Sequence, residues 1–239
     1  YPFYEARLGM PHPLCYLLVL QYPLLELFMS FNFDDYYPTL AKDRQLACII
    51  KQVGPCSIEA PKKVNLFESL CRSITFQQLA GSAASTIYGR FLDLVFCQKE
   101  NLCPEAVIGF KVHELKYAGL SKNKATAILD LAARCLDGSL PANEELHLFS
   151  NQELIEKLTE VKGIGPWTVE MFLMFTLGRP DIISTGDYGL KKGLMLLDGK
   201  KEMPTPSEFT VRAERWRPFR SIACWYLWRT VDLKLKSNS

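Results

Sequence analysis

Apolar residues recur at intervals of three and four along most of the chain after about residue 37, which is the spacing of one face of an α-helix. Helix start signals precede several of these runs: Asn65 with Glu68, Ser121, Ser150 with Glu153, and Thr205 with Pro206 and Glu208. A last helix is predicted to open at Pro218. No stretch shows sustained alternation with a period of two. The pattern predicts an all-α fold.

The most informative segment predicts two helices joined by a tight turn. A capped helix ends near Val161, Gly163 and Gly165 flank Ile164, and Pro166 begins a second helix that stops at Gly178. The glycines let the backbone turn while the isoleucine packs between the helices. Amides at such a turn and helix N-terminus favour a phosphate and grip DNA without reading its sequence. We therefore predict a helix-hairpin-helix motif at about 151–177, against the alternative of a plain helical reversal, with DNA-backbone contacts at Gly163, Ile164, Gly165 and Thr168.

Asp187 stands at the predicted start of a helix that carries Leu190, Leu194 and Leu197. An ordinary N-cap is one interpretation of this position. The same position also favours a charged carboxylate, because helix amides and the helix dipole stabilise negative charge. Cleavage of a glycosidic bond needs such a group, since the sugar takes on oxocarbenium character as the base leaves. Asp187 is therefore a candidate catalytic residue.

Several segments, taken in order, resemble the 3-methyladenine DNA glycosylase II family of the helix-hairpin-helix superfamily. They are Ile74-Thr-Phe-Gln-Gln-Leu79, Gly119-Leu-Ser-Lys-Asn-Lys-Ala125, the hairpin, Gly186-Asp187-Tyr188 and Trp216-Arg-Pro-Phe-Arg-Ser221. The resemblance covers roughly 38–232 and implies two helical subdomains with the active site in the cleft between them. Residues 1–36 do not resemble the sheet-containing N-terminal domain of the bacterial inducible enzymes. We expect the short form: a flank at 1–36 and a glycosylase domain at 37–239.

The resemblance implies an enzyme that flips alkylated purines, of the 3-methyladenine or 7-methylguanine type, out of duplex DNA and hydrolyses the N-glycosidic bond to leave an abasic site. Asp187 matches the catalytic aspartate, and Leu79 falls near the side chain that fills the gap left by the flipped base. Aromatic positions of the base pocket are matched by Trp167, Tyr188 and Trp228. Positively charged alkylpurines stack well on such rings. Core packing is the alternative for these aromatic residues and for Leu79. Met171 replaces a pocket tyrosine of some members, which leaves the substrate range open.

Two other readings of the motif are disfavoured. A bifunctional glycosylase–lyase needs an amine for a Schiff base, and its lysine lies two residues after the second hairpin glycine, where this chain has Trp167. Lys162 precedes the turn. A non-catalytic helix-hairpin-helix DNA-binding module would not need Asp187 together with Trp167 and Tyr188. The sequence therefore predicts a monofunctional DNA-3-methyladenine glycosylase II.

Composition and charge add limits on partners and cofactors. With 28 Lys and Arg against 26 Asp and Glu, the net charge is only +2, so DNA must meet a local face. The eight cysteines form no C-x-x-C pair and no His cluster accompanies them, which predicts no metal site and favours a reducing compartment. No apolar run approaches the ~20 residues of a membrane span. We expect a monomer that binds double-stranded DNA with alkylated bases, in the nucleus, or in the cytoplasm if the source is bacterial. No cofactor is expected, although a monovalent cation could bind the hairpin carbonyl groups.

Overall fold

Helices dominate the computed structural model, which describes residues 29–30, 32–60, 64–97 and 101–237. In this part of the chain the only strands are β1 (Met29–Ser30) and β2 (Glu59–Ala60), which form one short antiparallel pair. The prediction of an all-α fold is confirmed. No helix among these residues is both long enough and apolar enough to cross a membrane.

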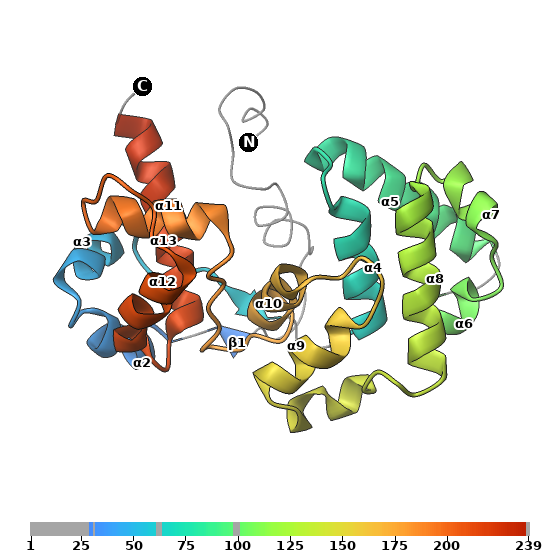
Figure 1. Ribbon diagram of the computed structural model, residues 1–239, viewed down its shortest axis with the longest axis horizontal. Coiled ribbons are helices and arrows are strands. Elements are labelled where there is room, and N and C mark those ends of the chain that lie inside the picture. Colours follow the sequence, from blue (N-terminus) through green and yellow to red (C-terminus); the bar gives the residue numbers. More distant parts are fainter. Residues whose placement is uncertain (1–28, 31, 61–63, 98–100, 238–239) are drawn as a thin grey trace.

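One subdomain is built from consecutive helices around α8 (Figure 1). Its members are α4 (Leu66–Phe76), α5 (Gly81–Phe96), α6 (Pro104–Val107), α7 (Val112–Tyr117) and α8 (Lys122–Leu136). Helix α8 packs against α4, α6 and α7, and its apolar face is fully buried at Ala125, Ile128, Leu131 and Ala132. Because these residues recur with the period of the helix, they form one continuous apolar face, which is buried within the subdomain.

The second subdomain combines segments from both ends of the described chain (Figure 1). It contains α2 (Phe33–Leu40), α3 (Arg44–Val53), α11 (Tyr188–Leu197), α12 (Pro206–Ala213), the 3-10 turn η2 (Glu214–Trp216) and α13 (Arg220–Ser237). Tyr36 is fully buried, and its hydroxyl lies 3.1 Å from that of Tyr226. The predicted domain boundary at residue 37 therefore falls inside α2, one residue after Tyr36, which belongs to the core. The rest of the predicted flank, 1–28 and residue 31, lies outside the described residues.

The hairpin joins the two subdomains. After the 3-10 segment η1 (Asn143–Leu148), α9 (Asn151–Thr159) and α10 (Pro166–Phe175) pack on each other, and α10 also contacts α4. The loop that leaves α10 then leads into α11 of the second subdomain. The segment that we predicted to bind DNA is thus directly continuous with the segment that carries Asp187.

Capping residues set the helix boundaries largely as the sequence predicts. Ser150 with Glu153 and Thr205 with Glu208 form reciprocal capping boxes, and the Asn65 side chain accepts from the Glu68 amide at 3.0 Å. Two boundaries differ. The apolar pattern predicts that the helix after Asn65 runs to Leu79, but α4 ends at Phe76, because Gln77 leaves the helical conformation at ψ 131° and Gln78 is left-handed at φ 56°. Helix α13 begins at Arg220 and not at Pro218, which follows a cis peptide bond.

Helices α11 and α13 approach each other closely at Gly193. A Cβ atom added there would lie 2.3 Å from the carbonyl oxygen of Leu227 and 2.7 Å from its carbonyl carbon. Both obstacles are backbone atoms, so the clash cannot be relieved by turning a side chain. The absence of a side chain at residue 193 therefore sets the spacing of the two helices that carry Asp187 and Trp228.

We expect Gly193→Ala to destabilise the fold by about 1–3 kcal/mol or more, the usual cost of forcing extra atoms into a packed contact. Chemical denaturation followed by circular dichroism measures this change. Gly89→Ala is the matched control, because Gly89 lies within helix α5 with open space around its Cα. Alanine there should be neutral or stabilising. Equal stabilities of the two variants would show that α11 and α13 can separate at no cost.

Candidate active site

Asp187 is the N-cap of α11, and the residue is only 7% exposed. Three N–H groups donate to it. The Leu190 amide and the Trp228 indole reach Oδ1 at 2.7 Å and 3.1 Å, and the Trp167 indole reaches Oδ2 at 2.8 Å. Such donors, together with the positive end of the helix, stabilise negative charge on a buried carboxylate. The site is therefore built to hold an anion away from bulk water.

The three side chains of this cluster come from three different helices. Trp167 lies in the first turn of α10, directly after the hairpin, and Trp228 lies in the middle of α13. The Trp228 ring is buried and packs on Phe175 with a centroid distance of 5.8 Å. Sequence reasoning named Asp187, Trp167 and Trp228 separately, and the structure brings them together at the junction of the two subdomains.

The loop that leads to Asp187 is held by the beginning of α13. The Ser221 hydroxyl donates to the Arg179 carbonyl at 2.6 Å and accepts from the Ile182 amide at 2.9 Å. The Arg220 guanidinium forms an ion pair with Asp181 at 2.6 Å. These contacts explain the role of the Trp216–Ser221 run in this chain. Sequence reasoning noticed the run only as part of a resemblance, because its partners lie some 40 positions earlier.

Glu170 is a second carboxyl group near Asp187 that the sequence analysis missed. It lies one turn after Trp167 on α10 and accepts a 2.5 Å hydrogen bond from the hydroxyl of Ser184, which is fully buried. Burial raises the pKa of Glu170 despite this hydrogen bond, and the charge of Asp187 raises it further. The Ser184 carbonyl in turn accepts from the Asp187 amide at 3.2 Å. Glu170 therefore helps to fix the turn that aims Asp187.

The hairpin turn has the geometry that the sequence predicts. Gly163 adopts φ 76°, Ile164 is buried, and Gly165 is the N-cap of α10. The Thr168 side chain is also buried, and its amide donates to the Gly165 carbonyl at 3.0 Å. The Ile164 amide is likewise used inside the turn, where it donates to the Val161 carbonyl at 3.1 Å. The predicted phosphate contacts of Ile164 and Thr168 therefore cannot use their backbone amides, and the prediction rests on Gly163 and Gly165.

Two further predicted residues, Tyr188 and Leu79, are not among the donors to the Asp187 carboxylate. Tyr188 begins α11 and is 61% exposed, so it is accessible to a ligand from solvent. Leu79 follows the left-handed Gln78 in the loop between α4 and α5 and is partly buried. These positions are compatible with contacts to DNA and do not belong to the interior of either subdomain.

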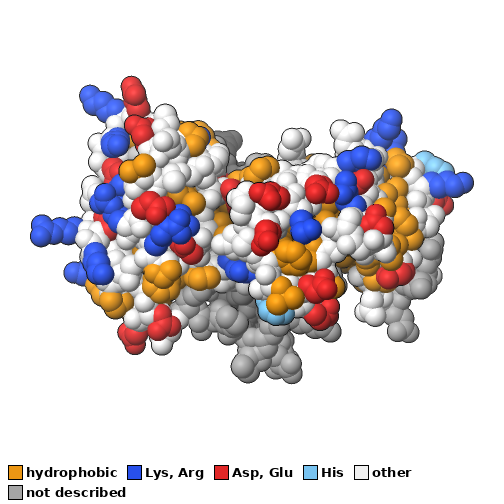
Figure 2. All heavy atoms as spheres, turned by 60° about the horizontal axis from the view of Figure 1, so that its bottom comes forward, with side chains coloured by type: hydrophobic (Ala, Val, Ile, Leu, Met, Phe, Trp, Pro, Cys, Tyr) orange, Lys and Arg blue, Asp and Glu red, His pale blue; other side chains and the backbone are white. Residues whose placement is uncertain are grey.

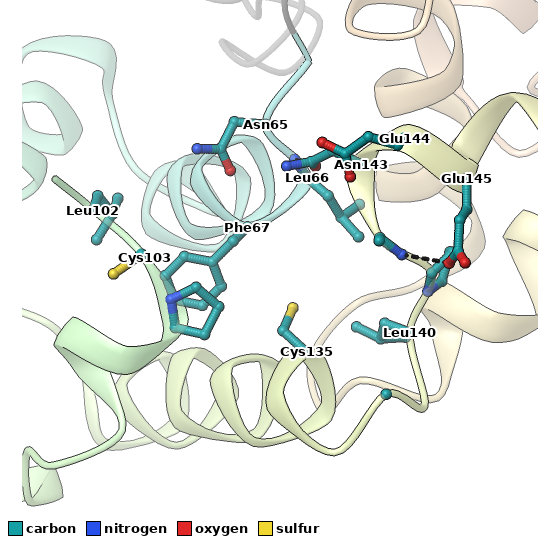
Figure 3. A pocket seen from close by; sticks show the side chains of 14 residues that line it. Asn65, Leu66, Phe67, Leu102, Cys103, Cys135, Leu140, Asn143, Glu144 and Glu145 are labelled. Carbon is teal, nitrogen blue, oxygen red and sulfur yellow. Dashed lines mark hydrogen bonds between the residues drawn. The ribbon is translucent and has the colours of Figure 1, made fainter.

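A separate pocket of about 500 Å³ opens in the first subdomain (Figure 3). Phe67 of α4, Cys103 at the head of α6, Cys135 of α8 and Leu140 line it, with Glu145 at its edge. None of its lining residues belongs to the hairpin or to the loop before Asp187. It is therefore distinct from the carboxylate cluster. Among the described residues, no group of three or more His, Cys, Asp or Glu side chains could hold a metal ion.

Comparison with known proteins agrees with this geometry. Residues 71–218 match the family described as HhH-GPD superfamily base excision DNA repair protein. The chain is 32% identical over 196 residues to the alkylbase DNA glycosidase-like protein mag2 of Schizosaccharomyces pombe, covering 82% of this chain and 92% of that protein. It is 35% identical over 172 residues to DNA-3-methyladenine glycosylase 1 of the same yeast, covering 72% and 75%. The chain belongs to the HhH-GPD superfamily.

Solved structures of this superfamily share the fold. The DNA-3-methyladenine glycosidase of Bacillus halodurans superimposes with a TM-score of 0.77 at 36% identity, over 88% of this chain and 95% of that one. S. pombe Mag1 in complex with abasic DNA gives 0.71 at 32% identity, over 83% and 97%. The resemblance to 3-methyladenine DNA glycosylases inferred from the motifs is confirmed.

We expect the stability of this HhH-GPD protein to depend on the ionisation of Glu170. Its pKa is raised from an ordinary value of 4.5, so the stabilisation from its neutral form is fully present at lower pH. That stabilisation is lost as pH rises through the raised folded-state value. Glu170→Gln does not titrate, yet its amide oxygen can still accept from Ser184. The variant should therefore gain stability relative to wild type as pH rises through this window.

Thermal melting of both proteins from pH 4 upward measures the effect. Glu202→Gln is the control, since Glu202 lies on an exposed loop. A constant difference between wild type and Glu170→Gln across this range would mean that burial does not disfavour the Glu170 charge.

Proposed function

We propose that this chain is a monofunctional DNA glycosylase that flips an alkylated purine out of duplex DNA and hydrolyses its N-glycosidic bond, with Asp187 as the catalytic carboxylate. The observation that carries the proposal is the buried Asp187 carboxylate, held by two indole N–H groups and the start of α11, at the point where the hairpin meets the second subdomain. Relatives named as DNA-3-methyladenine glycosylases support the reaction class.

The hydrogen bonds of Asp187 support a role as a fixed negative charge. A carboxylate has about four acceptor sites, two on each oxygen. Oδ1 accepts from both Leu190 and Trp228, whereas Oδ2 accepts from Trp167 alone. One acceptor site on Oδ2 thus remains for the sugar or for an attacking water. A charge held so close to C1′ would stabilise the oxocarbenium character of the transition state without any rearrangement of the site.

The chemistry of the damaged base supports the choice of substrate. Alkylation at a ring nitrogen gives a purine a positive charge, so the base leaves as a neutral molecule and needs no proton from the protein. Cationic rings are attracted to the faces of tryptophan and tyrosine. The indoles of Trp167 and Trp228 donate to Asp187, and Tyr188, the next residue in the chain, is accessible from solvent. We assign these three aromatic residues to the recognition of the flipped base.

The position that would hold a lyase amine supports hydrolysis by water. Trp167 occupies it, and the indole N–H is bonded to Asp187. The Lys162 ammonium lies on the other side of the turn, 3.4 Å from a carboxylate oxygen of Asp130. Lys162 is not among the groups that contact Asp187, which supports water and not an amine as the nucleophile.

The charge distribution supports DNA binding through the hairpin and not through a general basic surface. On the face shown in Figure 2, acidic and basic side chains are interspersed, in line with the net charge of +2. The backbone amides of Gly163 and Gly165, before the start of α10, would then bind phosphate. Action as a monomer is part of the proposal. A monovalent cation bound by the hairpin carbonyl groups would be compatible with this role and is part of the proposal.

Asp187→Asn should lower the single-turnover rate of excision from N-methylpurine DNA by far more than tenfold, and tenfold alone corresponds to ~1.4 kcal/mol of barrier. Affinity for DNA should be nearly unchanged, because the hairpin is intact. The asparagine NH₂ would face an indole N–H, so folding is verified by circular dichroism. Asp93→Asn, on the exposed face of α5, is the control. A folded Asp187→Asn protein that retains more than about a tenth of the wild-type rate would remove Asp187 from the mechanism.

The product should be an intact abasic site. Borohydride traps a Schiff base between enzyme and sugar, so it should give no covalent complex here while the base is released at its normal rate. Gel electrophoresis of the DNA after brief reaction, with and without alkali, measures strand cleavage and trapping together. A covalent complex formed as fast as base release would show that a lysine acts as nucleophile.

A further inference from the structure

One face of α8 contacts the end of α4, before the loop that carries Leu79, and also the hairpin turn. These are the two segments for which the sequence predicts contacts with DNA. Lys124, Ala127 and Asp130 are spaced by three residues and therefore lie along one side of the helix. At the first of these positions, the Lys124 ammonium donates to the carbonyl oxygens of Thr75 at 2.7 Å and Gln77 at 2.8 Å. These carbonyls belong to the end of α4, where an α-helix leaves acceptors unpaired and where a positive charge is favourable.

The other two positions contact the hairpin turn. A Cβ atom on Gly163 would lie 3.5 Å from the Ala127 side chain, in ordinary contact. The Asp130 carboxylate accepts from the Lys162 amide at 3.0 Å and lies 3.4 Å from its ammonium group. Along one side of α8, Lys124 thus contacts the end of α4, Ala127 lies next to Gly163, and Asp130 contacts Lys162.

Gln77 closes the connection between the two elements. Its side-chain NH₂ donates to the Gly163 carbonyl at 3.0 Å, while its own carbonyl accepts from Lys124. The next residue, exposed Gln78, is the one non-glycine residue with positive φ among those described, and Leu79 follows it. A left-handed conformation at a residue with a side chain is unfavourable and persists only where neighbouring contacts hold it. Gln77 and Lys124 supply those contacts.

We propose that Lys124, Gln77 and Asp130 form a clasp by which α8 holds the loop 77–80 at a fixed distance from the hairpin turn, so that Lys124 is a positioning residue for base flipping. The inference rests on the proposed function, in which Leu79 enters the DNA stack while the hairpin grips the backbone. Lys124 itself would touch neither the base nor the phosphates, because its ammonium group is bonded to protein carbonyls.

The loop 77–80 and the hairpin turn would contact the same DNA duplex at the same time. The distance between them must therefore match the distance between the two contacted positions on the DNA. A loop that moves relative to the hairpin would have to be ordered each time a base is flipped, and this ordering costs conformational entropy. The Lys124 ammonium is partly buried, and this burial lowers its pKa. A lysine with no role in holding the carbonyls would be better placed in solvent.

Lys124→Met keeps the length and apolar stem of the side chain and removes the two hydrogen bonds. We expect the single-turnover rate on a paired duplex that carries one N-methylpurine to fall by about tenfold or more. On the same duplex with an abasic site opposite the lesion, which weakens stacking and pairing, the rate should fall by less than about threefold. Lys116→Met, an exposed lysine on α7, is the control for loss of charge.

A measurement that needs no excision separates this proposal from the proposed function. In the Asp187→Asn background, 2-aminopurine placed next to the lesion should brighten when the protein binds and unstacks it, and Lys124→Met should reduce that rise. If fluorescence rises with the wild-type protein but no base is excised, the glycosylase assignment is wrong. A smaller rise with Lys124→Met would still support the clasp in that case.

Gln77→Ala completes the test. Because both residues hold one loop, the double variant should lose less than the product of the two single losses. Losses that multiply, equal losses on the paired and abasic-opposed duplexes, or an unchanged rate for a folded Lys124→Met protein would each overturn the clasp.

Discussion

Placing a carboxylate in a protein interior is costly unless donors replace its lost water, and the arrangement around Asp187 follows from that constraint. Its donors come from α10, α11 and α13, so the three helices must meet at one point. Gly193 allows α11 and α13 to come close enough for Trp228 to reach the carboxylate. Arg220 and Ser221 hold the loop that delivers Asp187 to its position. Contacts far apart in sequence thus serve one charged group.

The division into two subdomains has a consequence for the same site. Helix α8 fixes the hairpin turn to the first subdomain through Asp130, whose carboxylate accepts from the Lys162 amide. The second helix of the hairpin, α10, then carries Trp167 and Glu170 to the second subdomain. Any relative movement of the subdomains would therefore pull Trp167 away from Asp187. The polar contacts at the junction favour one relative position of the two parts.

Local features of the fold could be predicted because their causes are local. The capping boxes at Ser150 and Thr205 and the turn at 163–165 depend on residues within four positions of one another. The position of Asp187 at a helix start is of the same kind. The partners of its carboxylate were not predictable from such patterns: Trp228 lies 41 residues further along. Lys124 gave no signal either, because a lysine near a helix start is ordinarily exposed, and only the structure shows the carbonyls of α4 above it.

Trp167 combines constraints that the sequence analysis treated separately. It stands two residues after the second hairpin glycine, in the first turn of α10, and its indole N–H is one of the donors to Asp187. The turn that would bind phosphate and the group that polarises the carboxylate are therefore joined by Pro166 alone. A shift of the turn would be transmitted directly to the hydrogen bond on Oδ2, the oxygen with an acceptor site left for the reaction. A lysine at residue 167 could provide a nucleophile, but the indole N–H that donates to Asp187 would then be missing. Residue 167 can therefore supply either an amine for a Schiff base or a donor that orients the carboxylate. In this chain the structure is organised around the carboxylate.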